Sequence, residues 1–302
     1  FDAVDGVLDH SYATGSPDAG FYIGQCYPCD AIVNNVVSEY NGLGYSGTNS
    51  GGSLYITSSI FRNNKGGLAP NTLDSELLPP ERETFIIGNL IENNNNYNSP
   101  ATNSTYLSYG NGVVIAGGNN NIIKNNVIVD HDLYGVILTA SMDVNYWPAH
   151  GNRVEENLIL SSRKADIAVS GVSNLANCFE GNYFNTSIPP GLQALNGCEK
   201  NIIPLSADLS GLWSTIARLI YANTGDFYQD DWRTLPAPEQ QENMPIMQEI
   251  IDANDNGQYE LGFYQYLPSF KNSVKPAVNV YEDYKYTLKD VQLPQDAIKY
   301  LN

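Results

Sequence analysis

Positive charge is scarce in this chain. Only 15 of its 302 residues are Lys or Arg, against 33 Asp or Glu, which gives a formal net charge of −18 at pH 7. Nucleic-acid binding depends on clustered Lys and Arg side chains that contact phosphates, so we expect no nucleic-acid partner. The same charge balance disfavours direct binding of polyanionic sugars, unless a cation lies between sugar and protein.

Long apolar runs are also missing. No stretch approaches the roughly 20 consecutive apolar residues that a membrane-spanning helix needs, so we expect no membrane span. The chain opens FDAVDGVLDH, which has no signal-peptide pattern and already resembles the repeat described below. We therefore expect that a processed or separate N-terminal part precedes Phe1.

Cysteine is rare, with four residues that fall into two pairs. A disulfide between Cys178 and Cys198 would close a loop of about 20 residues and contribute roughly 3 kcal/mol. Cys26 and Cys29, in CYPC, suit a local disulfide between two repeats, although a redox or metal site is the alternative for this spacing. An even number of cysteines favours an oxidising compartment, so we expect an extracellular or cell-surface protein.

What the chain has in abundance is a repeated phrase in its first 200 residues. Two or three apolar residues are followed by a polar pair ending in Asn, and then by two more apolar residues. The copies are IVNNVV (32–37), YITSSIF (55–61), FIIGNLI (85–91), IIKNNVI (122–128), VEENLI (154–159) and CFEGNYF (178–184). Aligned on one position, they place these residues in register: Asn35, Ser59, Asn89, Asn126, Asn157 and Asn182. Self-similarity at this period is typical of a solenoid.

The phrase predicts short strands, because each apolar run lasts only four to seven residues before Gly, Asn, Asp or Ser intervenes. A second strand family follows each turn, as in GFYIG (20–24) and GVVIAG (112–117). In parallel strands stacked in register, equivalent Asn side chains lie over one another and can form a ladder of hydrogen bonds. The sequence therefore predicts an all-β fold, a right-handed parallel β-helix of roughly seven rungs.

These Asn-punctuated rungs resemble the right-handed parallel β-helix repeat proteins, the broad pectate-lyase-like group. Stretches such as DAGFYIGQC, GYSGTNSGG, PNTLDSE and GNGVVIAGGN resemble secreted bacterial β-helix proteins of unknown role. The resemblance covers roughly residues 1–200 and implies the fold. It does not select an activity, because the group includes lyases, hydrolases, epimerases, adhesins and inert scaffolds.

Three regions are expected along the chain: the β-helix at 1–200, a helical cap or flank at 201–234, and a C-terminal extension at 235–302. The apolar residues of the segment 206–225 follow helical spacing, which predicts an amphipathic helix. Prolines at 236, 238 and 245 indicate an extended linker. The chain ends in a short charged helix-like segment, which we expect to form an accessory module or an arm that docks on the solenoid or on a neighbouring subunit.

Two inserts interrupt the regular spacing, at residues 68–83 and 93–110, and loops on a rigid scaffold are where binding residues concentrate. The first insert contains Asp74 and Glu76, followed by Glu81, Arg82 and Glu83. Carboxylates on neighbouring rungs could act as a glycosidase pair. The motif NTLD resembles the β-helix hydrolase Asn-Thr-Asp signature only with an extra residue, and no Gly-His-Gly follows.

A second candidate site is the tripeptide Asp130-His131-Asp132. A His flanked by carboxylates can serve as a general base, because neighbouring negative charge raises its pKa. The tripeptide also falls at a turn of the repeat, where Asp is common for backbone reasons. Both interpretations stay open at this point.

A candidate calcium loop lies near residue 255. Oxygen-bearing side chains at alternate positions, followed by Gly257, match the start of an EF-hand-type loop, although Phe263 stands where the last acidic ligand is expected. A plain turn is the alternative. The ligands would be Asp252, Asn254, Asn256 and Glu260. Calcium is the one cofactor that the sequence suggests.

Two classes of function follow. The first is a secreted or cell-surface scaffold that binds a polysaccharide or surface glycan, or that assembles with other protein subunits stacked on the solenoid end, without catalysis. The second is a carbohydrate-active enzyme, a lyase, epimerase or glycoside hydrolase, that acts in a groove on the β-helix face. The absence of a matching catalytic motif favours the scaffold.

Overall fold

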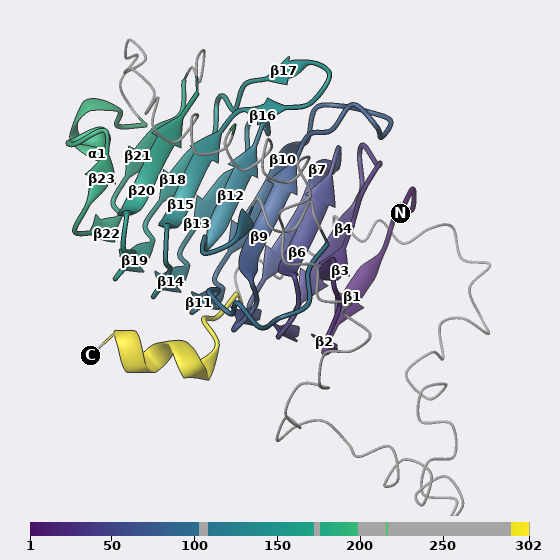
Figure 1. Ribbon diagram of the computed structural model, residues 1–302, viewed down its shortest axis with the longest axis horizontal. Coiled ribbons are helices and arrows are strands. Elements are labelled where there is room, and N and C mark those ends of the chain that lie inside the picture. The colour runs from purple at the N-terminus through teal and green to yellow at the C-terminus, as the bar shows by residue number, and fades with distance from the viewer. Residues whose placement is uncertain (103–107, 172–175, 199–215, 217–290, 302) are drawn as a thin grey trace, which may run out of the picture.

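Three parallel sheets run along the repeat region in a computed structural model that describes residues 1–102, 108–171, 176–198, 216 and 291–301 (Figure 1). Each sheet has seven strands, and every strand pairs in parallel with the equivalent strand of the next rung. Sheet A contains β1 (Val7–Asp9), β4 (Ala31–Asn34), β7 (Gly51–Thr57), β10 (Arg82–Ile87), β13 (Ile122–Lys124), β18 (Arg153–Glu155) and β21 (Cys178–Glu180). Sheet B contains β2 (Tyr12–Thr14), β5 (Val37–Glu39), β8 (Ile60–Arg62), β11 (Leu90–Glu92), β14 (Val127–Val129), β19 (Leu158–Leu160) and β22 (Tyr183–Phe184).

Sheet C completes each rung, so the chain passes from sheet A to B to C and then returns to A. Its strands are β3 (Ala19–Tyr22), β6 (Leu43–Thr48), β9 (Gly66–Asn71), β12 (Val113–Ala116), β15 (Tyr134–Thr139), β20 (Ala165–Ser170) and β23 (Ser187–Ile188). The predicted all-β solenoid is therefore confirmed, as is the rung number. At the usual spacing between strands, seven rungs extend over about 30 Å.

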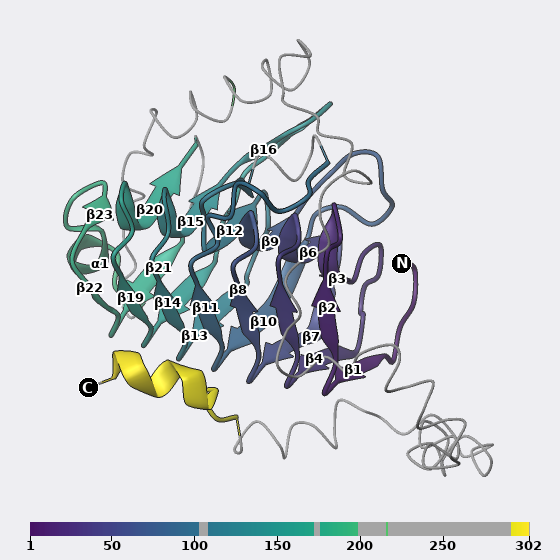
Figure 2. The same cartoon turned by 60° about the horizontal axis from the view of Figure 1, so that its bottom comes forward.

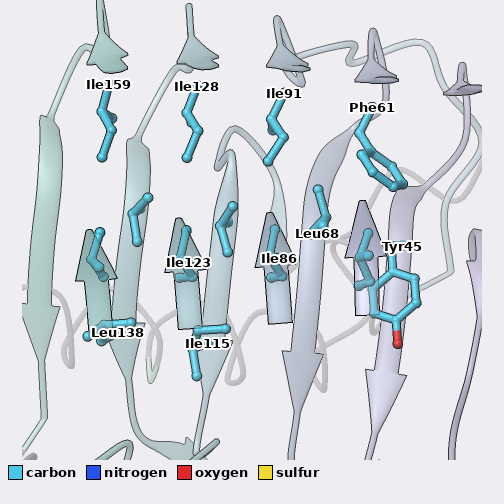
Figure 3. Close-up of a cluster of buried hydrophobic side chains, with 14 of the residues drawn as sticks. Tyr45, Phe61, Leu68, Ile86, Ile91, Ile115, Ile123, Ile128, Leu138 and Ile159 are labelled. Carbon is cyan, nitrogen blue, oxygen red and sulfur yellow. The ribbon is translucent and has the colours of Figure 1, made fainter. Parts of the chain in front are cut away.

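The core is a stack of apolar columns that runs the length of the solenoid. Figure 3 shows one such column from sheet B, in which Phe61, Ile91, Ile128 and Ile159 lie side by side on consecutive strands along the solenoid axis. All four side chains are fully buried. Because each rung adds one side chain to each column, burial of about 1.5–3 kcal/mol per side chain depends on the neighbouring rungs.

The predicted Asn ladder is present at the turn between sheets A and B. Ser59 N–H donates to Asn89 Oδ1 (3.0 Å), and Asn89 N–H and Nδ2 both donate to Asn126 Oδ1 (2.9 and 3.0 Å). Asn126 bonds to Asn157 in the same way, and Asn157 to Asn182. All five side chains are buried, so the ladder satisfies polar groups that water cannot reach.

Asn35 is a correction to the predicted ladder. The register pairs Asn34 with Thr57, so Val36, two residues after Asn34, stands at the ladder position of Ser59 and points inward. Asn35 itself is exposed and has a φ of 50°. The phrase IVNNVV was aligned on its second Asn. That Asn adopts the left-handed conformation of the turn, one position before the ladder.

Two further ladders occupy the other two corners of the solenoid. Between sheets B and C, Asn41 donates to Asn64 Oδ1 (2.9 Å from the backbone), and Asn64 donates to Asn94 Oδ1 (3.0 Å from the side chain). Between sheets C and A, Asn121 N–H donates to Asn152 Oδ1 (2.9 Å), and Asn152 donates likewise to Asn177. The sequence analysis found neither ladder, because loops of varying length separate their members.

A left-handed residue precedes the ladder position at each corner. Between sheets A and B these residues with positive φ are His10, Asn35, Ser58, Gly88, Asn125, Glu156 and Gly181. The conformation turns the chain sharply enough to aim the next side chain inward. Asn, Asp and Gly adopt it at least cost, which explains why these residue types recur at the corners.

The short helix α1 (Leu192–Leu195) ends the ladder between sheets A and B. Gln193 Oε1 accepts hydrogen bonds from Asn182 N–H and Nδ2, both 2.9 Å, in place of a further Asn. The predicted disulfide Cys178–Cys198 joins the chain after this helix to β21. Cys26–Cys29 is the second disulfide, at the corner between sheets C and A, so the local pairing of CYPC is confirmed.

The last described residues of the chain dock on the outer face of sheet B. Residues Gln295–Tyr300 form a 3₁₀ helix that lies along this face (Figure 2). Ala297 is fully buried against Leu90, Val127 and Val129. Glu92 of β11 accepts a hydrogen bond from Tyr300 Oη (2.6 Å), so polar contacts hold the segment as well.

Other predictions fall outside the described residues. The expected amphipathic helix at 206–225 and the candidate calcium ligands Asp252, Asn254, Asn256 and Glu260 lie there, as do most of the two C-terminal regions. Among the described residues, every helix is too short and too polar to cross a membrane.

We predict that Asn126→Ala destabilises the solenoid by about 3 kcal/mol, because it leaves the Asn89 donors and the Ile86 carbonyl unsatisfied in the core. Denaturant unfolding measures the change. Asn125→Gly in the same turn is the control, since Asn125 is exposed and its equivalents are Gly88 and Gly181. Equal losses for both variants would contradict a stabilising ladder.

Candidate functional site

A groove of about 440 Å³ lies on the outer face of sheet C. Strands β3, β6, β9 and β12 supply its floor, and the loop Thr72–Glu81 between β9 and β10 supplies one wall. The lining residues are Asp18, Tyr22, Leu43, Ser46, Thr48, Ala69, Asn71, Leu73, Glu76, Ser108, Val114, Ala116 and Ser141.

The parallel register places the floor residues in rows. Tyr22, Ser46 and Ala69 are consecutive partners across β3, β6 and β9. Thr48 and Asn71 are partners two residues further along. Alternate residues of a strand point to the same face, so both rows face outward while Tyr45 and Leu68 point into the core.

Asn71 fixes the polar part of the floor. Its Oδ1 accepts a hydrogen bond from Thr48 Oγ1 (3.1 Å), and its Nδ2 donates to Ser46 Oγ (3.3 Å) and to the Ala69 carbonyl (2.8 Å). The three side chains therefore have defined orientations before any ligand binds. Such preorganised polar groups beside apolar surface are typical of small-ligand sites.

Glu76 enters the groove from the loop. Tyr22 Oη lies 2.8 and 2.9 Å from the two carboxylate oxygens and donates to them. Asn49 Nδ2 donates to the carbonyls of Leu73 and Glu76 (2.7 and 2.8 Å), which ties the loop to the corner of the rung below. Burial raises the pKa of Glu76, so the groove lowers the stability of its charged form.

Asp18 is the second carboxylate of the groove, and the sequence analysis did not single it out. It immediately precedes β3, and its negative charge acts on both Glu76 and Tyr22. Although its side chain is open to solvent on one side, the protein around it raises its pKa by desolvation. Asp18 could have been found from the register of the second strand family, because GFYIG, which follows it closely, aligns with the later strands of sheet C.

Asp74, the other carboxylate predicted in this insert, lies outside the groove and holds two loops together. Its carboxylate accepts hydrogen bonds from Asn145 N–H (2.7 Å), Asn145 Nδ2 (2.6 Å) and Trp147 Nε1 (3.2 Å). These donors lower its pKa, with the backbone of Asn145 as the largest cause. Asn145 lies between β16 (Ser141–Met142) and β17 (Tyr146–Trp147), an antiparallel hairpin that the sequence analysis did not anticipate.

The tripeptide 130–132 is a corner of the solenoid, and the structure does not bring it to the groove. His131 is 1% exposed and stands at the ladder position equivalent to Asn94, with Nε2 3.3 Å from the Ile91 carbonyl. Burial lowers its pKa to about 4. The burial of the ring and its lowered pKa favour a structural role over the general-base interpretation of His131.

The two aspartates beside His131 have structural roles as well. Asp130 is exposed with a φ of 61°, the left-handed residue of this corner. Asp132 forms an ion pair with Arg163 (3.0 Å) and accepts a hydrogen bond from Tyr109 Oη (3.0 Å). Turn chemistry, the alternative interpretation of the tripeptide, accounts for both positions.

Glu81 is a buried acid inside the solenoid. Thr84 Oγ1 and Asn121 Nδ2 donate to its two oxygens, both at 2.8 Å, and burial raises its pKa to about 8. A Cβ atom at Gly118 would lie only 1.8 Å from Glu81 Oε2, so this carboxyl occupies space that only glycine leaves open. Its neighbours Arg82 and Glu83 instead contact Tyr27, on the outside of the rung.

Metal-binding geometry is confined to one group among the described residues. Glu155 lies close to the sulfur atoms of Cys178 and Cys198. Those two cysteines form a disulfide, so neither offers a thiolate ligand. This group therefore does not constitute a metal site.

No known protein-family model matches this chain, and no curated protein matches it. The sheets, the ladders and the groove consequently carry the functional argument by themselves. A solenoid of parallel sheets is compatible with many activities, so the fold does not select one of them.

We predict that Glu81 makes stability depend on pH. Between pH 4.5 and about 8 the folded chain keeps a proton on Glu81 that the unfolded chain has lost, so stability falls as pH rises through this window. The Glu81→Gln side chain stays neutral at every pH. The free energy of unfolding of this variant should therefore rise relative to that of the wild type by at most about 1.4 kcal/mol per pH unit. Denaturant unfolding of both proteins from pH 4 to 9 measures the difference. A stability difference that does not change with pH would contradict the prediction, because Glu81 would then ionise in the folded chain as in the unfolded one.

Proposed function

We propose that the chain is a secreted or cell-surface β-helix scaffold whose groove on sheet C binds a glycan. The single observation that carries the proposal is this groove, with hydroxyl and amide side chains fixed beside an apolar floor. A sugar ring has one apolar face and a rim of hydroxyls, and it can use both kinds of surface at once. The volume suits a few sugar units, within the roughly 300–1,000 Å³ of typical ligand sites.

The scaffold supports this role through its rigidity. The floor strands β6, β9 and β12 pair on both sides and β3 pairs with β6, so the groove is formed without a ligand and little ordering entropy opposes binding. Two disulfides fit an oxidising location outside the cytoplasm. The repeat resembles the right-handed, pectate-lyase-like class, which includes secreted proteins. Stacking of other subunits on the solenoid end stays a prediction.

The test is a binding screen of the full chain against neutral and charged oligosaccharides. Asn71→Ala should weaken the affinity for a bound glycan about 10-fold, which is 1.4 kcal/mol, because the orientations of Thr48 and Ser46 are lost. The matched control is Asn34→Ala on the outer face of sheet A, where Asn34 makes similar contacts with Asp9 and Thr57. Absence of any binding, or equal effects of both variants, would contradict the proposal.

Hydrolysis of the glycan is the second candidate function, favoured by two carboxyl groups in one groove. Asp18 would donate a proton to the glycosidic oxygen as the bond from that oxygen to C1 breaks. Glu76 would take a proton from the water whose oxygen bonds to C1. A lyase would need a cation or Arg beside a sugar carboxylate, and the described lining residues include neither Lys nor Arg.

Release of reducing ends from the bound glycan tests the hydrolase. We expect Asp18→Asn and Glu76→Gln each to lower the rate about 100-fold, the effect of removing one general acid or base. Glu180→Gln, an exposed substitution on β21, is the control with the same change of charge. Binding without any cleavage would agree with the scaffold function and contradict the hydrolase function.

A further inference from the structure

We propose that the groove on sheet C selects a glycan that carries amino groups, such as a chain of glucosamine units, over neutral and acidic glycans. This inference rests on the proposed function, and it adds the chemical class of the ligand. The evidence is the charge of the groove, the lack of cationic partners for its two carboxylates, and the orientation of the sheet beneath it.

The charge of the lining has one sign. Asp18 and Glu76 are its carboxylates, and Tyr22 is the remaining titratable group among the described lining residues. No Lys, Arg or His belongs to this described lining. A sugar carboxylate would therefore meet like charge from both acidic side chains, whereas an ammonium group would meet opposite charge.

The two carboxylates lack a cationic side-chain partner on the described part of the chain. Glu76 accepts its hydrogen bonds from the neutral phenol of Tyr22. Burial raises the pKa of Glu76, and the negative charge of Asp18 raises it further. A ligand ammonium between them would relieve both the repulsion and part of the desolvation.

A basic peptide would offer the same charge, but the position of the groove favours a sugar. Extended peptides bind sheets by adding a strand at an edge, where backbone donors and acceptors are free. The groove lies on a sheet face, and its floor strands β6, β9 and β12 already pair on both sides, while β3 is the edge strand of the sheet. A ligand there must bond to side chains such as Ser46, Thr48 and Asn71, which suits hydroxyl groups.

The experiment compares two ligands with the same backbone. Isothermal titration of the full chain would use β-1,4-linked glucosamine oligomers, their N-acetylated counterparts, and oligogalacturonate, all at pH 6 and low salt. We expect the glucosamine oligomer to bind about 10-fold tighter than its N-acetylated form, which corresponds to 1.4 kcal/mol. Oligogalacturonate should bind weakest.

Two variants assign the preference to the groove. Glu76→Gln keeps an acceptor for Tyr22 and removes the charge, and Asp18→Asn removes the charge of the other carboxylate. Each should reduce the preference for the amino sugar about threefold or more, measured as the ratio of its affinity to that of the N-acetylated oligomer. Glu180→Gln removes an equal charge far from the groove lining and should change nothing.

The outcomes separate this inference from the proposed function. Equal binding of the amino and N-acetylated oligomers, or tighter binding of oligogalacturonate, would overturn the inference and leave a glycan-binding groove. Absence of binding by every oligosaccharide would overturn both. Equal affinity for an oligolysine of similar length, lost in the same two variants, would overturn the sugar specificity and identify a general cation site.

Discussion

Parallel stacking in register is the constraint on which the rest of this structure depends. Each rung must place an equivalent residue above and below its neighbours at every strand and every corner. At the corners a left-handed residue turns the chain, and the following side chain points inward and bonds to the next rung. Polar groups that would be costly to bury are therefore satisfied along the whole axis.

This constraint also determines which residues remain for function. His131 is an imidazole used as a corner residue, and Glu81 is a carboxyl bonded inside the rung. Both have pKa values displaced by burial, yet neither can reach a ligand, which shows that a perturbed pKa alone does not identify a site here. The accessible acids, Asp18 and Glu76, lie where the stack leaves a face uncovered.

The groove results from combining regular and irregular parts of the chain. Successive rungs of sheet C provide a flat and rigid floor, and one long loop provides the wall that carries Glu76. Asp74 joins that loop to the hairpin two rungs further on, so two insertions support each other. The strongly acidic surface has a local counterpart in a groove that holds carboxylates and no basic side chain among its described residues.

The sequence alone determined the solenoid, its rung number and one of three ladders. That ladder was visible because a two-residue turn joins sheet A to sheet B in every rung, as at Gly88 and Asn89, so the spacing between strands never changes. Loops of varying length kept the other two ladders from showing as a repeat in the sequence. Asn35 was misplaced by one position because an amino-acid sequence does not show which residue of an Asn pair adopts the left-handed conformation. Only the tertiary structure brought Asp18 to Glu76, since the two lie 58 positions apart and meet through strand register and a loop fold that no local pattern encodes.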